Sequence, residues 1–214
     1  MKKAIVLGGT GMVGSKLIQL LTENTDFSEI VSLVRRKSEV SNPKLSEFIV
    51  NFDEPDTWNK YVSGDVLFST LGTTIAQAKT KDAQYKVDFN YQFSVAKTAA
   101  DNGVSNYVLV SSAGANPASK NFYLKMKGEL EVAVKTLPFQ TAIILQPGQL
   151  TGNRIQKRTG EKIALIVMTG LNKLGLFKRY MPVQALVVAN AMIKAVYLKK
   201  TTTYTLNEIF KLAE

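Results

Sequence analysis

The chain opens with an apolar run that leads directly into a glycine-rich turn. Residues 3–7 read Lys-Ala-Ile-Val-Leu, GGTGMVG follows at 8–14, and an amphipathic stretch occupies 15–21. A strand, a glycine turn and a helix in this order are what a dinucleotide-binding βα unit requires. Gly8 would make the tight turn, Gly11 would leave room for a pyrophosphate, and Gly14 would let the helix lie close to its strand. The free N–H groups at the helix start would then bind the phosphates.

Short apolar strands and helices continue to alternate along the chain. Further strands are expected at 29–34, 48–52, 65–69, 106–112 and 141–145, and helices near 57–61, 78–102 and 122–135. This pattern predicts an α/β domain in which helices cover both faces of a doubly wound parallel sheet, the three-layer Rossmann fold. Ligands of such sheets bind at the carboxyl ends of the strands, so the residues just past the strands should form the site.

Length and composition favour one domain. The chain has 214 residues, 45% of them hydrophobic, without a low-complexity linker or a repeat. Residues 1–214 are therefore expected to form a single domain, to which 149–214 add a small helical region on the substrate side. An apolar stretch at 163–177 is the candidate wall of the substrate pocket, and a core helix is an equally good interpretation of it.

The residue types limit the chemistry. The chain contains no cysteine and no histidine, which removes thiolate nucleophiles and the commonest metal ligands and general bases, so no metal site is expected. We expect no membrane span and no secretory signal, because the apolar runs are too short, and hence a cytoplasmic protein. The net charge of +10 is spread along the sequence without a nucleic-acid-binding module, so it favours an anionic small molecule over nucleic acid.

The end of the second strand indicates which dinucleotide binds. Proteins that bind NAD usually place an acid there, about 20 residues beyond the glycines, to hold the ribose hydroxyls. Here Arg35, Arg36 and Lys37 follow the strand, and Glu39 already lies beyond its tip. Two guanidinium groups can bind a 2′-phosphate through charge-assisted hydrogen bonds. We therefore predict NADP(H) as the cofactor in preference to NAD, with a solvent-exposed basic turn as the alternative.

Tyr123 and Lys127 are the candidate proton-transfer pair. Of the eight tyrosines only Tyr123 has a lysine four residues later, and on a helix this spacing places both side chains on one face. A nearby ammonium stabilises a phenolate, as general acid–base catalysis by a phenol requires. Ser111 and Ser112 close the preceding strand and are placed to polarise a substrate carbonyl. An exposed helix face and a strand-end turn are the ordinary alternatives.

The order of these segments resembles the short-chain dehydrogenase/reductase superfamily, and within it the atypical Tat-interacting-protein-like oxidoreductases: GGTGMVG, LGTT, VSSAGAN, YLKMKGELE and LQPG. The resemblance covers nearly the whole chain and is strongest over 107–148. It implies that Ser112 (or Ser111) orients a carbonyl oxygen and that Tyr123 transfers the proton. It also implies that Lys127 binds the nicotinamide ribose, that Asp53 meets the adenine, and that Pro147 faces the nicotinamide. The complete set of predicted cofactor-binding residues is Gly8, Thr10, Gly11, Met12, Val13, Gly14, Arg35, Arg36, Asp53, Leu71, Gly72, Thr73, Lys127 and Pro147.

One position departs from the pattern of the superfamily. Many members carry asparagine where Asp88 falls here, so either Asp88 substitutes in a proton relay or the relay is absent. The predicted function is an NADP(H)-dependent oxidoreductase that transfers a hydride between nicotinamide and a carbonyl or alcohol of a small molecule. The alternatives are an NADPH-binding regulatory protein with little turnover, and a nucleotide-sugar epimerase or dehydratase, for which the 66 residues after Gly148 are few. The substrate and the oligomeric state are left open.

Overall fold

Seven parallel strands form the central sheet of the computed structural model, which describes residues 1–151 and 182–214. The sheet order is β3-β2-β1-β4-β5-β6-β9. The strands are β1 (Lys2–Leu7), β2 (Phe27–Val34), β3 (Leu45–Ile49), β4 (Val66–Ser69), β5 (Asn106–Val110), β6 (Thr141–Gln146) and β9 (Thr202–Thr205). The chain leaves β1 first toward β2 and β3 and then toward β4, β5 and β6. The strand order therefore reverses between β1 and β4, the place where such sheets bind ligands.

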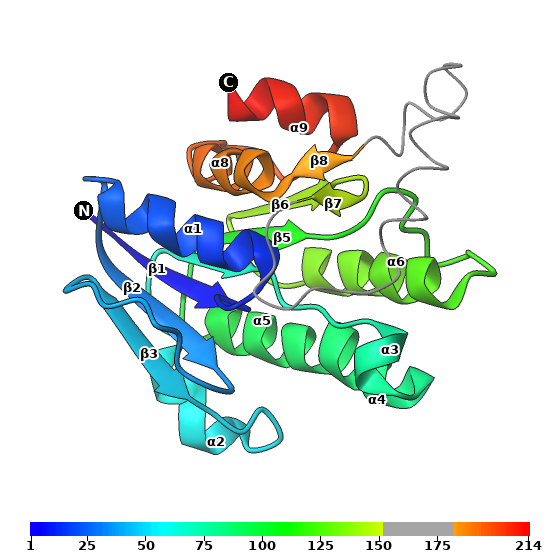
Figure 1. Cartoon of the computed structure of the whole chain (residues 1–214), viewed down its shortest axis with the longest axis horizontal. Coiled ribbons are helices and arrows are strands. Elements are labelled where there is room, and N and C mark those ends of the chain that lie inside the picture. Colours follow the sequence, from blue (N-terminus) through cyan, green and yellow to red (C-terminus); the bar gives the residue numbers. More distant parts are fainter. Residues whose placement is uncertain (152–181) are drawn as a thin grey trace.

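Helices cover both faces of the sheet (Figure 1). One face carries α1 (Met12–Glu23), α8 (Ala185–Ala195) and α9 (Leu206–Ala213), and the other carries α5 (Gln92–Asp101) and α6 (Phe122–Lys135). Successive strand residues point to opposite faces, so Val6 belongs to the core under α1 and Ile5 to the core under α5. Strands buried on both faces explain the continuous apolar runs in the sequence. The predicted three-layer Rossmann fold is confirmed.

The helix expected at 78–102 begins slightly later than predicted. Residues 81–101 are helical without interruption, as α4 (Lys81–Tyr85), a π-helical turn (Lys86–Tyr91) and α5, and the short helix α3 (Ile75–Ala78) precedes them. The break after α3 occurs at Lys79, which has a φ of 75°, and the Thr80 side chain caps α4 by accepting from the N–H of Ala83. A π-helical turn adds a residue to the helical repeat and is frequent at functional sites. The predicted long helix is therefore confirmed over 81–101, whereas hydrophobic periodicity did not register the break at Lys79 or the π-helical turn.

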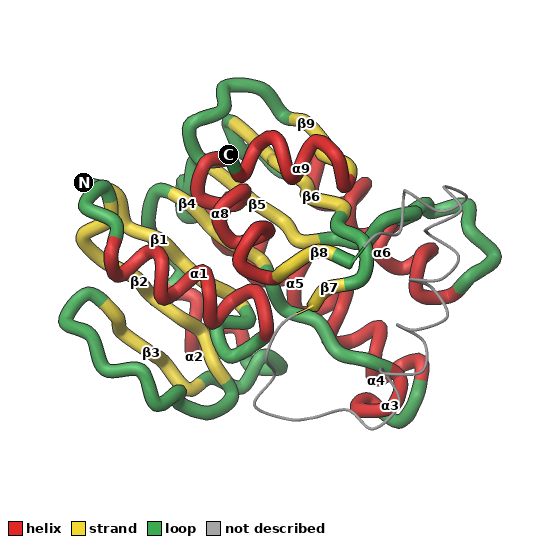
Figure 2. Tube along the Cα trace, turned by 45° about the horizontal axis from the view of Figure 1, so that its top comes forward, coloured by secondary structure: helices red, strands yellow, loops and turns green. Residues whose placement is uncertain are grey.

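The C-terminal residues that the structure describes complete the fold. The short strands β7 (Leu150–Thr151) and β8 (Val183–Gln184) pair with each other, β9 adds the seventh strand beside β6, and α8 packs against α1 (Figure 2). The apolar stretch at 163–177, expected to form the substrate wall, lies outside the described residues. The substrate-side role of 149–214 therefore stays a prediction. Within residues 1–151 and 182–214, no helix has both the length and the apolar character needed to cross a bilayer.

Between β3 and β4 lie the short helix α2 (Pro55–Trp58) and a 3₁₀ turn (Asn59–Tyr61), close to the helix expected at 57–61. The Trp58 side chain is completely buried, and its indole N–H donates to the carbonyl oxygen of Asn51. This contact anchors the chain just past β3. It thereby places Phe52 and Asp53 at the same edge of the sheet as the glycine turn.

Candidate functional site

The glycine turn has the backbone geometry predicted for it. Gly8 has a φ of +87°, a left-handed conformation that glycine adopts without strain, and its carbonyl oxygen accepts from the N–H of Gly11 at 2.9 Å. The next residue, Met12, begins α1, whose first turn has no acidic residue and no side-chain cap. Thr10 and Gly11 are exposed, whereas Val13 is buried in the core. The first N–H groups of α1 and its positive dipole end are therefore available to an anionic group.

Two glycines of the turn are needed for different reasons. A Cβ atom at Gly14 would lie 2.2 Å from the carbonyl oxygen of Gly8 and 2.7 Å from Oγ1 of Thr70, so the helix could not stay against the strand. A Cβ atom at Gly11 would lie 3.1 Å from the same Gly8 oxygen, a tight contact that a shift of a few tenths of an ångström relieves. The fold thus requires glycine at 14, whereas Gly11 leaves the approach to the helix start open.

We therefore expect Gly14→Ala and Gly11→Ala to have different effects. Overpacking at position 14 should destabilise the fold by about 1–3 kcal/mol and abolish dinucleotide binding. Gly11→Ala should melt close to the wild-type temperature and weaken NADPH binding, because the added methyl group occupies the approach to the N–H groups. Thermal unfolding and calorimetric titration with NADPH measure both effects. A wild-type melting temperature for Gly14→Ala would contradict this assignment.

A cavity opens beside the ends of β2, β3 and β4. Its lining is aromatic and aliphatic apart from one guanidinium group, and consists of Arg35, Phe52, Leu71, Val87 and Tyr91. The rings of Phe52 and Tyr91 stack with their centroids 5.3 Å apart. The enclosed space is only about 10 Å³, which holds a water molecule and not a purine ring, so a planar ligand would have to stack on its aromatic and guanidinium rim. Arg35 and Leu71 are among the predicted site residues, whereas Phe52, Val87 and Tyr91 are not.

Asp53 lies beside this cavity but has partners within the protein. Its carboxylate accepts from the Lys86 ammonium at 2.8 Å and from the Tyr91 hydroxyl at 3.0 Å. The hydrogen bond from Lys86 lowers the pKa of the Asp53 carboxyl, and the same bond raises the pKa of Lys86. Asp53 thus holds Tyr91 at the edge of the cavity. Its predicted contact with adenine stays a prediction.

The loop after β4 connects the glycine turn to the interior. The Thr70 hydroxyl donates to the carbonyl oxygen of Leu7 at 2.9 Å, and a Cβ atom at Gly8 would lie 2.6 Å from the N–H nitrogen of Leu71. Farther along the loop, the N–H of Thr73 donates to Oδ2 of Asp88 at 2.8 Å. Gly72 and Thr73, predicted to flank the adenosine half of the cofactor, therefore lie next to Asp88.

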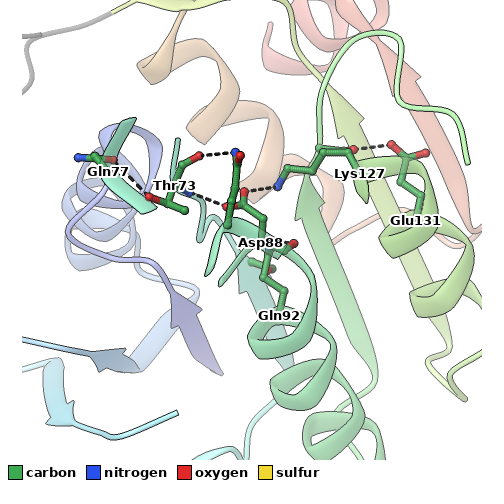
Figure 3. Close-up of polar contacts among 9 residues, drawn as sticks. Thr73, Gln77, Asp88, Gln92, Lys127 and Glu131 are labelled. Carbon is green, nitrogen blue, oxygen red and sulfur yellow. Dashed lines mark hydrogen bonds and ion pairs between the residues drawn. The ribbon is translucent and has the colours of Figure 1, made fainter. Parts of the chain in front are cut away.

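Asp88 and Lys127 form a buried ion pair (Figure 3). The Nζ atom of Lys127 lies 3.2 Å from Oδ1 of Asp88, and the two side chains are only 3% and 1% exposed. The π-helical turn carries Asp88, and the Gln92 amide donates to the Asp88 carbonyl oxygen at 2.7 Å. Asp88, which occupies the position where many superfamily members carry asparagine, is thus the counter-ion of Lys127.

The electrostatics of this pair depend on burial and on mutual attraction. Desolvation alone would lower the pKa of Lys127, but the negative charge of Asp88, with smaller effects from Tyr123 and Glu131, outweighs it and raises that pKa. Burial raises the pKa of Asp88 above its ordinary value, and Lys127 opposes this rise. The lysine is therefore held as a cation inside the protein.

The other predicted catalytic residues lie on α6 and at the end of β5. The Asn121 side chain caps α6 by accepting from the N–H of Leu124 at 3.1 Å. Tyr123 is half-buried, with the Lys127 ammonium 6.0 Å from its ring centroid, which confirms that the two share one helix face. Ser112 is half-buried, and within the described part of the chain its hydroxyl has no hydrogen-bond partner. Ser111 is buried, and its hydroxyl donates to Glu131.

The loops after β5 and β6 are joined by their backbones. The N–H of Ala113 donates to the carbonyl oxygen of Pro147 at 2.9 Å, and Pro147 itself is buried. A Cβ atom at Gly128 would lie 2.3 Å from the backbone of Asn116, so α6 packs directly on the loop that follows Ser112. These contacts bring the predicted serine, tyrosine, lysine and proline residues to one end of the sheet.

Comparison with known proteins supports a nucleotide-binding domain. The sequence model of a family described as NAD(P)H-binding matches residues 8–169. "Protein FMP52, mitochondrial" of Coccidioides immitis is 33% identical over 180 residues, which cover 78% of this chain and 73% of that protein. The Saccharomyces cerevisiae protein of the same name is 36% identical over 159 residues, which cover 72% and 68%.

Solved structures show the same fold. ADP-L-glycero-D-manno-heptose-6-epimerase of Helicobacter pylori superposes with a TM-score of 0.73 at 18% identity and covers 99% of this chain and 81% of its own. A short-chain dehydrogenase/reductase superfamily protein of Agrobacterium tumefaciens with bound NAD superposes with a TM-score of 0.72 at 11% identity, covering 96% and 78%. At these identities the likeness establishes the fold, which is that of dehydrogenases and epimerases.

The cytoplasmic location expected from the sequence is contradicted, because the similar fungal proteins are named as mitochondrial. Location is decided by address signals that receptors read, and a Rossmann core carries none of that information. The matched family model covers more than half of the chain, and the fungal relatives exceed 30% identity over more than two thirds of it. The chain therefore belongs to the NAD(P)H-binding family, as an NAD(P)-binding Rossmann domain with structural neighbours in the short-chain dehydrogenase/reductase superfamily.

Proposed function

We propose that the protein is an NADP(H)-dependent oxidoreductase acting on a carbonyl or alcohol group of a small molecule. The observation that carries the proposal is the buried Lys127–Asp88 pair one helical turn from the half-buried Tyr123, at the same end of the sheet as the glycine turn. When bound, the nicotinamide supplies or accepts the hydride. The protein's residues bind the cofactor, orient the carbonyl oxygen and move the proton.

The preference for a 2′-phosphate rests on the end of β2. Arg35, Arg36 and Lys37 are exposed, and among the residues that the structure describes none of them forms an ion pair. Arg35 also lines the small cavity beside Phe52 and Tyr91, and we place the adenosine against the mouth of that cavity. An adenosine placed there would bring its ribose 2′ position next to guanidinium groups that have no competing carboxylate. A bidentate guanidinium–phosphate contact is among the strongest charge-assisted hydrogen bonds.

Proton transfer is assigned to α6 and to the end of β5. In the reductive direction the Ser112 hydroxyl would donate a hydrogen bond to the carbonyl oxygen. As the carbonyl carbon receives the hydride that bound nicotinamide would supply, the Tyr123 hydroxyl would give its proton to that oxygen, which leaves the alcohol and a phenolate. The Lys127 ammonium stabilises that phenolate, and Asp88 keeps the lysine charged despite its burial. The phenolate regains its proton from solvent before the next turnover. In the oxidative direction the same groups act in reverse.

Calorimetric titration with NADPH and with NADH tests the cofactor assignment. Wild-type protein should bind NADPH more tightly, and Arg35→Gln or Arg36→Gln should weaken NADPH binding about 10- to 100-fold with little effect on NADH, because each loses a charge-assisted bond to phosphate. Lys97→Gln is the control, since it removes one positive charge from an exposed pair on α5. Equal affinity of the wild type for both nucleotides would refute the phosphate preference.

A reductase assay on aldehydes, ketones and quinones tests the reaction class. NADPH oxidation with at least one of these substrates is the expected result. Tight NADPH binding without turnover across the panel would instead indicate a regulatory NADPH-binding protein. The two assays therefore separate cofactor recognition from catalysis.

A further inference from the structure

Glu131 is a buried carboxylate to which the proposed chemistry gives no task. It lies on α6 one turn after Lys127 and is 6% exposed. Its oxygens accept one hydrogen bond from the Ser111 hydroxyl and two contacts from the Gln146 amide, at 2.9 and 3.0 Å. Within the described ranges no lysine or arginine forms an ion pair with it. Its hydrogen-bond partners are neutral, and its charge acts on the Lys127 ammonium only through space. Burial of a carboxylate without an ion-pair partner is unfavourable, so a purely structural role would be better served by an apolar residue.

Glu131 and its two partners belong to the three elements that carry the proposed active site. Ser111 is the residue before Ser112 at the end of β5, and Gln146 is the residue before Pro147 at the end of β6. Glu131 itself lies on α6 with Lys127 (Figure 3), and Tyr123 belongs to the same helix. Backbone bonds join the two loops to each other, and the N–H of Asn116 in the loop after β5 donates to the carbonyl oxygen of Leu124 on α6 at 3.0 Å. The Glu131 carboxylate adds a buried side-chain connection that ties α6 to the ends of β5 and β6 at once.

Neighbouring residues at a strand end point in opposite directions. Because Ser111 turns its hydroxyl inward to Glu131, the adjacent Ser112 remains partly exposed. We propose that Glu131 is a positioning residue that fixes the Ser112 hydroxyl relative to the Tyr123 hydroxyl by holding β5 and β6 against α6. This inference rests on the proposed oxidoreductase function.

The hydrogen-bonding capacity of the side chain explains why a carboxylate occupies this position. A carboxylate accepts several bonds at once, as the hydroxyl and the amide together require. Glutamine in its place can accept from the Gln146 amide through its oxygen and donate to the Ser111 oxygen through its nitrogen, because a hydroxyl is both donor and acceptor. Methionine has a similar length but can make neither bond.

Glu131→Met and Glu131→Gln therefore form the test pair. We expect Glu131→Met to lower kcat about 10- to 100-fold, because small displacements of catalytic groups have effects of this size. Its dissociation constant for NADPH should stay within about twofold of wild type, since the glycine turn and β2 are untouched. Glu131→Gln should recover most of the lost kcat. Glu129→Gln is the matched control with wild-type kcat, because Glu129 lies on the same helix but pairs with Tyr85 and Lys125 at the surface.

The outcomes separate this inference from the function on which it rests. Wild-type kcat in Glu131→Met, in a protein whose Tyr123→Phe variant is inactive, would overturn the positioning role and leave the oxidoreductase function standing. A parallel loss of NADPH binding and kcat, without recovery in Glu131→Gln, would also overturn it. If Glu131→Met does not fold, Gln146→Met removes the other side of the same contact and should lower kcat in the same way. Absence of turnover in the wild type would refute both proposals.

Discussion

Replacement of Tyr123 by phenylalanine is expected to lower kcat by about 10²- to 10⁴-fold, the usual contribution of a general acid–base. The ring would keep its position beside the Lys127 ammonium, 6.0 Å from its centroid, so packing should not change. Only the proton donor disappears. NADPH should therefore bind as tightly as to the wild type, and the effect should appear in kcat rather than in the dissociation constant. Steady-state kinetics and calorimetry on the same preparation measure both quantities.

Tyr85→Phe is the matched control for that experiment. Tyr85 is also partly buried, and its hydroxyl donates to Glu129 on α6 at 3.1 Å. Loss of this hydroxyl should leave kcat close to the wild-type value. The hydroxyl joins α4 to Glu129 of α6 and touches none of the proposed catalytic groups. A fully active Tyr123→Phe variant would exclude the tyrosine from the mechanism, whatever the substrate.

Removal of the Lys127 charge is expected to be the most destabilising single change in the site. Lys127→Met would leave the Asp88 carboxylate buried without its counter-ion, and breaking a buried pair in this way costs about 3–5 kcal/mol. The double variant Lys127→Met/Asp88→Asn should regain much of that stability, because neither side chain is then charged. Chemical denaturation of the wild type, both single variants and the double variant forms a complete cycle. Lys97→Met, at an exposed pair, should not change the unfolding free energy measurably.

The loss of unfolding free energy in Lys127→Met, called the deficit below, should depend on pH because it depends on the pKa of Asp88. Burial raises the pKa of the Asp88 carboxyl above its ordinary value of 3.8, and Lys127 opposes that rise. Below pH 3.8 a carboxyl whose pKa is raised by folding is protonated in both the folded and the unfolded protein, so no charge is buried. As the pH rises above 3.8 the carboxyl ionises more readily in the unfolded protein, and the folded state loses stability. The deficit of Lys127→Met relative to the wild type should therefore be smallest in acid and should grow toward neutral pH. A deficit that is constant with pH, or one that Asp88→Asn does not relieve, would show that Asp88 is not its source.

The glycine turn and the tyrosine–lysine pair were predictable because their signals are local. Gly8 and Gly14 follow an apolar strand and precede a helix, and the close contact at Gly14 is the one that its spacing predicts. Tyr123 and Lys127 lie four residues apart on a helix whose bounds, Phe122–Lys135, agree with the sequence pattern. The apolar runs also predict a parallel sheet covered on both faces, because strands of that kind have no polar side.

The sequence by itself thus determined the order of the strands and helices, the three-layer fold and the chemical groups past the strand ends. Only the tertiary structure decided which of those groups meet. It paired Lys127 with Asp88 through a π-helical turn that periodicity does not reveal, and it separated Ser111, bound to Glu131, from the partly exposed Ser112. It also brought together Arg35, Phe52 and Tyr91, which follow three different strands, around one cavity. The physical reason is that hydrophobic patterns report the face on which a residue lies, whereas hydrogen bonds and ion pairs depend on distances between segments far apart in the chain.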